Sequence, residues 1–169
     1  MVQGPAAKVL RQIIKTNLLE SPTIMDFLEG REEDIQIYRF SDIDPEVLPL
    51  ILIGTPEEKS TTLTDDPPAY RNHITLTVDV FCPVKEADIL DDITFEIRNR
   101  LSEIVFARGT FEPLKHDRTV TASYQAGTKL VAASASEYST FIDLEYNRDH
   151  TYPLFERMLV NGTVHQPHD

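Results

Sequence analysis

The chain has 169 residues, of which 41% are hydrophobic, and a formal net charge of −12. This length and apolar fraction indicate one globular domain, and no apolar run approaches the roughly 20 residues that span a bilayer. The 28 acidic residues outnumber the 16 basic ones, which argues against nucleic-acid binding through phosphate neutralisation. The single cysteine, Cys82, cannot form an internal disulfide and so favours a reducing compartment.

The N-terminal part of the chain predicts a helix followed by a short strand. Residues 6–20 carry apolar side chains at helical spacing, and Ser21-Pro22 ends the pattern. A short apolar piece follows at 23–28, and residues 35–40 alternate between apolar and polar, as in a strand. The apolar helical positions are Val9, Leu10, Ile13, Ile14 and Leu18.

A strand and a long polar connection come next. Residues 48–54 are nearly all apolar, which predicts a strand that is covered on both faces or paired at its edge. Residues 55–71, TPEEKSTTLTDDPPAYR, are expected to form a loop. Two interpretations stay open: a floppy hairpin loop, or a segment that orders against a partner. For the second, the candidate contact residues are Asp65, Asp66, Tyr70 and Arg71.

Residues 72–104 contain the clearest pattern in the chain. Ile74, Leu76, Val78 and Val80 alternate with polar residues, so we expect a strand with one apolar and one wet face. Pro83 ends this strand because proline cannot donate to the ladder. A helix at about 86–104 follows, with acids in its first turns and arginines near its end, as the helix dipole favours. Its predicted apolar stripe is Ile89, Ile93, Ile97 and Leu101, joined by Leu90.

The remaining sequence predicts further strands. Residues 119–124 alternate, 125–128 form a turn, and the small residues of 129–137 are ambiguous between strand and loop. Residues 140–146 predict a closing strand with Thr140, Ile142, Leu144 and Tyr146 on one face. The expected fold is therefore α+β: a mainly antiparallel sheet with an N-terminal helix and one long helix packed on it. We expect residues 1–150 to form a single domain and 151–169 a partly mobile C-terminal extension.

The sequence offers little support for catalysis. It contains none of the glycine-rich phosphate loops, zinc-binding HExxH pairs or nucleophile elbows that mark common enzyme classes. The acidic groups Asp65-Asp66 and Asp88, Asp91 and Asp92 are better explained as a turn and a helix start than as metal ligands. His165 and His168 are spaced like a pair of metal ligands, but we do not expect residues so near a chain end to be held in the fixed geometry that a metal site needs. We therefore expect no catalytic residue, no metal site and no cofactor.

The order of elements resembles the tail terminator proteins of long-tailed phages, the lambda-type minor tail protein U-like family. Three segments carry the resemblance: FLEGREEDIQIYRFSDIDPEVLPLILIGTPEE, ITLTVDVFCPVKEADILDDITFEIRNRL and VTASYQAGTKLVAASASEYSTFIDLEY. Together they span roughly residues 27–146. The connection at 55–71 is longer than the family pattern, and the extension after residue 147 also departs from it.

The resemblance implies a structural virion protein rather than an enzyme. Family members form a homo-oligomeric ring, usually a hexamer, that caps the tail tube, ends its polymerisation and presents a joining surface to the head connector. The implied partners are the major tail tube protein and the head–tail connector protein, with DNA only as cargo through the channel and no membrane. The implied location is the head-proximal end of the virion tail, with the host cytoplasm during assembly.

Three other functions stay open on the sequence. The nearest is a head–tail joining or neck protein, or the tail tube protein itself. A metal-dependent hydrolase that uses the acidic clusters is the alternative from a different class, and it lacks paired ligands at a fixed spacing. A small adaptor that binds a peptide by strand addition would need no ring.

Overall fold

The computed structural model describes residues 5–37, 45–66, 68–145, 159–160 and 163–164. The helices are α1 (Pro5–Leu19), α2 (Pro22–Phe27) and α3 (Ala87–Ser102), with short 3₁₀ turns at Glu32–Asp34, Pro45–Val47 and Val84–Glu86. The strands are β1 (Ile35–Ile37), β2 (Leu50–Asp65), β3 (Pro68–Pro83), β4 (Lys115–Ala126), β5 (Lys129–Glu145), β6 (Leu159–Val160) and β7 (Thr163–Val164). The predicted extension 151–169 lies outside the described residues except for β6 and β7, which pair with each other.

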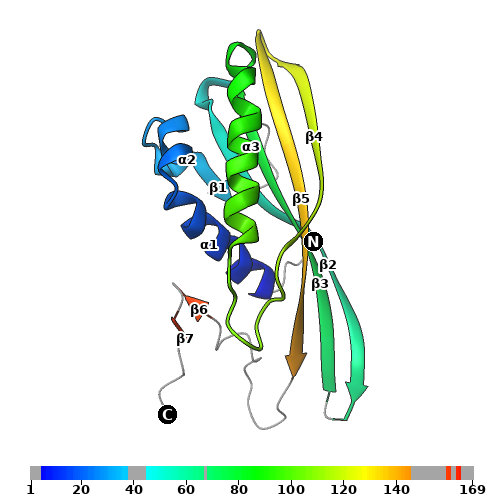
Figure 1. Ribbon diagram of the computed structural model, residues 1–169. Helices are drawn as coiled ribbons and strands as arrows, with labels where there is room; N and C mark the ends of the chain where they lie inside the picture. Colours follow the sequence, from blue (N-terminus) through cyan, green and yellow to red (C-terminus); the bar gives the residue numbers. More distant parts are fainter. Residues whose placement is uncertain (1–4, 38–44, 67, 146–158, 161–162, 165–169) are drawn as a thin grey trace.

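Five strands form one long sheet in the order β1-β2-β3-β5-β4. β1 runs parallel to β2, and every other neighbouring pair in this sheet is antiparallel. The helices lie together on one side of the sheet, and the turns of the β2–β3 and β4–β5 hairpins point to opposite ends of the molecule (Figure 1). The predicted α+β class is therefore confirmed.

The main core lies between the helices and the sheet. Ile74, Leu76, Val78 and Val80 point toward the helices and are fully buried, as their alternation predicts. They pack with Leu10, Ile14 and Leu18 of α1 and with one face of α3.

The predicted stripe of α3 is wrong at one position. Leu90, Ile93, Ile97 and Leu101 are buried, whereas Ile89 is 44% exposed. An α-helix has 3.6 residues per turn, so each four-residue step advances about 40° beyond a full turn. Three such steps back from Leu101 therefore place Ile89 away from the core face. Leu90 is buried on that face instead.

The expected loop at 55–71 is instead a β-hairpin. β2 continues to Asp65 and pairs with β3 from Glu57↔Thr75 to Asp65↔Pro68, with register shifts between Gly54 and Glu57 and between Thr62 and Thr64. The run of threonines and serine suits strands. The segment lacks apolar alternation because the hairpin extends past the helices (Figure 1), and residues 59–65 of β2 are exposed on both faces.

The ambiguous segment 129–137 is the first half of β5. Its inward residues are small, and Ala132, Ser134 and Ser136 are buried. The Thr94 hydroxyl of α3 donates a hydrogen bond to the Leu90 carbonyl at 2.7 Å and lies 2.9 Å from the Ser134 hydroxyl, from which it can accept one. Small side chains therefore let α3 approach this strand closely, which local alternation alone does not predict.

The sequence predicts that one face of β3 is exposed to solvent. This prediction is only partly right, because the sheet face that points away from the helices is exposed along part of its length and buried elsewhere. Leu50, Leu52, Phe81 and Val131 form a separate small core there. Asp79 lies on the same face, paired across the strands with Leu52 and Ala135, and is half-buried. Burial raises the pKa of Asp79 to about 6.

Candidate assembly surface

The end of the β2–β3 hairpin holds the four candidate contact residues, and the structure separates them. Asp65 ends β2 and Asp66 lies in the turn, and both are exposed. Tyr70 and Arg71 are neighbours in β3, so the strand alternation turns them to opposite faces. The hairpin end therefore offers two faces and a tip rather than one cluster.

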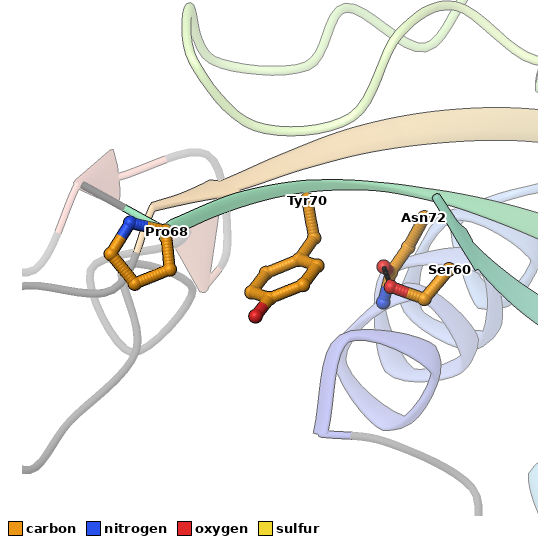
Figure 2. Close-up of a pocket in the computed structure, with 4 residues that line it drawn as sticks. All are labelled: Ser60, Pro68, Tyr70 and Asn72. Atoms are coloured by element: carbon orange, nitrogen blue, oxygen red, sulfur yellow. Dashed lines mark hydrogen bonds between the residues drawn. The ribbon is translucent and has the colours of Figure 1, made fainter. Parts of the chain in front are cut away.

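Tyr70 lies on the face that continues toward the helices. It lines a shallow pocket of about 340 Å³ together with Ser60, Pro68 and Asn72. Figure 2 shows Tyr70 and Asn72 projecting from the same side of β3. Ser60 donates a hydrogen bond to the Asn72 side-chain oxygen at 2.8 Å, which fixes the polar end of the pocket.

Arg71 lies on the other face and is held by β5. Its guanidinium donates to both carboxylate oxygens of Asp143, at 2.7 and 2.8 Å, and lies 3.4 Å from Glu112. It also sits 5.7 Å from the ring centroid of Phe141. The hydrogen bonds with Asp143 raise the pKa of Arg71 and lower the pKa of Asp143. Arg71 therefore ties the hairpin to β5.

A buried polar cluster between α1 and the hairpin was not predicted from the sequence. Arg11 is only 8% exposed and hydrogen-bonds to Thr55, while Asn72 donates to Glu58 at 2.6 Å. Burial lowers the pKa of Arg11, and the charge of Glu58 opposes that change. The position of Asn72, two residues before Ile74 on the inward face, is the sequence signal that could have placed it inside. This cluster fixes α1 against the base of the hairpin.

The other chemical candidates do not converge. Asp88, Asp91 and Asp92 are exposed along the first turns of α3, and the described part of the chain contains no group of three potential metal ligands. Cys82 is fully buried, and burial raises the pKa of its thiol. His165 and His168 lie outside the described residues. No described helix is both long and apolar enough to cross a bilayer.

Comparison with known proteins gives a likeness of fold. No family model matches the chain, and no curated protein matches it. Among solved structures, a chain described as belonging to the virion of native gene transfer agent (GTA) particle superposes with a TM-score of 0.57. The alignment covers 83% of this chain and 99% of that chain at 9% sequence identity. The two chains therefore share an α+β architecture over nearly all of the gene transfer agent subunit.

Proposed function

We propose that this chain is a structural protein of a phage-like virion. The observation that carries the proposal is the fold likeness, because it spans 99% of a gene transfer agent virion chain rather than a common substructure. The likeness to a virion chain is also in keeping with a non-catalytic role. Within the virion, the chain would act at the head-proximal end of the tail, after assembly in the host cytoplasm.

The specific role that we propose is that of a tail terminator. Residues 1–150 would form the ring-forming domain, with 151–169 as an extension, and six copies would meet head to tail through unlike surfaces. The ring would cap the tail tube, end its polymerisation and join the head connector. The end of the β2–β3 hairpin, with Asp65, Asp66, Tyr70 and Arg71, would belong to its contact surface, because it projects beyond the helices.

The experiment that tests this role is imaging of assembled particles with an antibody or affinity label on the chain. We expect one ring of label at the junction of head and tail, with about six copies per particle. Label spread along the tail would instead indicate the tube protein. One or two copies per particle would contradict the ring, and label in a separate collar of the neck would favour a head–tail joining protein.

DNA should pass this protein without binding to it. The chain has a net charge of −12, so a ring of six copies would repel the phosphates of DNA. With few cations to neutralise phosphates, it would also release few counterions, and counterion release is what drives non-specific DNA binding. We expect no gel shift with double-stranded DNA at low salt, where phosphate attraction is strongest. Micromolar binding there would contradict the proposal, as would magnesium-dependent nuclease activity that is lost in Asp88→Asn or Asp92→Asn variants.

A further inference from the structure

The five-stranded sheet has two open edges in the part of the chain that the structure describes. On one side, β1 covers β2 only at Ile51, Leu52 and Ile53, so the outer edge of β2 from residue 57 to residue 65 has no strand beside it. On the other side β4 is the last strand, and its outer edge is open over its whole length. An open edge presents a row of backbone donors and acceptors that can pair with another strand.

The two edge strands bury few side chains over their open parts. Residues 117–125 of β4 are exposed on both faces, and so are residues 59–65 of β2. Each edge strand is backed by two further strands of the sheet, since β3 pairs with both β2 and β5. The β2–β3 hairpin extends past the helices, whereas the β4–β5 hairpin ends about level with the start of α3 (Figure 1). The exposed part of each edge strand therefore adds no buried apolar surface within one copy and is available for pairing with another strand.

The usual protection of edge strands is only partial at these two. Proline is confined to Pro56, at the register shift near the base of the hairpin, and residues 57–65 contain none. β4 contains no proline, and its single irregularity lies between His116 and Arg118. A second register shift lies between Thr62 and Thr64, and each edge carries one lysine near its start, Lys59 or Lys115. The regular stretches that can accept a partner strand are therefore 57–62 of β2 and 118–126 of β4.

The charges of the two edges are complementary. β4 begins with Lys115 and Arg118 against a single acid, Asp117. The open part of β2 carries Glu57, Glu58 and Asp65 against the single base Lys59, and Asp66 follows in the turn. Within one copy Lys115 lies 3.8 Å from Asp117 and Arg118 lies 3.0 Å from Glu137. The start of β4 therefore offers basic groups that already have an acidic neighbour, and the end of β2 offers the acidic groups of Asp65 and Asp66.

The strand directions bring these ends together. β2 and β5 run the same way because both are antiparallel to β3, and β4 is antiparallel to β5. The β4 of a neighbouring copy that continues the sheet would therefore run antiparallel to β2, with its basic start beside the acidic end of β2. The two open edges are also displaced along the strands, and a sheet can close into a barrel only with such a stagger.

We propose that the open edge of β4 pairs with the open edge of β2 of the next copy of this chain, so that one continuous sheet runs around the ring. The inference rests on the proposed ring and adds the surfaces that close it. The contact is heterologous, since β4 meets β2 and never itself, and repetition of such a contact forms either a ring or an open filament.

Crosslinking of the full-length chain tests this pairing. The double variant Asp65→Cys/Lys115→Cys places one thiol at each edge, and both positions are exposed, so the melting temperature should not change. With a short bis-maleimide crosslinker at high protein concentration, we expect a ladder of oligomers that ends in one closed species. Each single variant should give no product beyond a dimer, because Cys82 is buried.

The matched control is Asp65→Cys/Phe95→Cys, which moves the second thiol to an exposed position on α3. A ladder of equal yield in this control, or no ladder in the edge pair, overturns edge pairing. Crosslinks from the edges to a different particle protein also overturn it. Particle imaging separates the two ideas: a ring at the head–tail junction without the edge crosslink keeps the terminator role, whereas the crosslink without such a ring keeps the pairing and removes that role.

Discussion

Replacing Ile93 with aspartate should lower the free energy of unfolding by about 4 kcal/mol. Ile93 is 2% exposed and packs in the main core between α3 and the sheet. The variant loses the apolar contacts of the isoleucine and buries a carboxylate with no cation beside it. Chemical denaturation followed by circular dichroism measures the change.

The matched control is Ile89→Asp, which makes the same chemical change one helical turn earlier. Ile89 is 44% exposed, so its replacement should change the stability by less than about 1 kcal/mol. An aspartate in the first turn of α3 is also compatible with the helix dipole. Equal losses in the two variants would contradict the buried face that the structure assigns to α3.

Replacing Asp79 with asparagine should stabilise the protein by about 2 kcal/mol at pH 7. Asp79 is half-buried on the sheet face away from the helices, and the apolar side chains of Leu52 and Ala135 lie directly across from it. Burial raises its pKa to about 6, from the ordinary value of 3.8 for an aspartate. The nearest charged groups in the register are Glu137 and Arg118, which are one row away and already form an ion pair.

The sign of the pH dependence follows from this raised pKa. Between about pH 4 and pH 6 the folded protein holds a proton on Asp79 that the unfolded chain has lost, so this group makes stability fall as pH rises through that range. Above about pH 6 the penalty is constant. Subtracting the pH–stability curve of Asp79→Asn from that of the parent chain should isolate this fall.

The Asp143→Asn variant is the control of opposite sign. The pKa of Asp143 is lowered by its hydrogen bonds with Arg71, so it contributes stability at neutral pH that is lost as pH falls through the folded pKa. This variant should therefore be less stable than the parent at pH 7 and should approach it in acid. A stabilising effect of Asp143→Asn, or a destabilising effect of Asp79→Asn, would contradict the environments described above.

The strong local patterns of the sequence were reliable guides to the fold. The two-residue alternation from Ile74 to Val80 placed the apolar face of β3 correctly, because one side of that strand meets the helices along this stretch. The helical periodicity of α1 and α3 was equally clear, and only the drift of a four-residue spacing misplaced Ile89. Where burial is one-sided, the pattern of side chains along the chain records it directly.

The candidate assembly surface is harder to predict because the β2 side of its hairpin is exposed on both faces. The sequence predicts a loop over residues 55–71, because a hairpin outside the core needs no apolar alternation. Only the pairing of this segment with β3 shows that it is a strand. Tyr70 and Arg71 are adjacent in sequence, but strand geometry places them on opposite faces. The contact between Arg11 and Thr55 joins segments 44 residues apart, and no local pattern encodes it.

By itself, the sequence determined the α+β class, the acidic balance and the absence of the common catalytic motifs, because these depend on composition and on patterns a few residues long. The tertiary structure decided the strand order β1-β2-β3-β5-β4, and with it which strands lie at the edges. An edge is a property of neighbours rather than of residues: nothing in β4 or in residues 57–65 marks either segment as an outer strand. Only the long-range pairing of the strands leaves β4 and residues 57–65 of β2 open on opposite sides of the sheet.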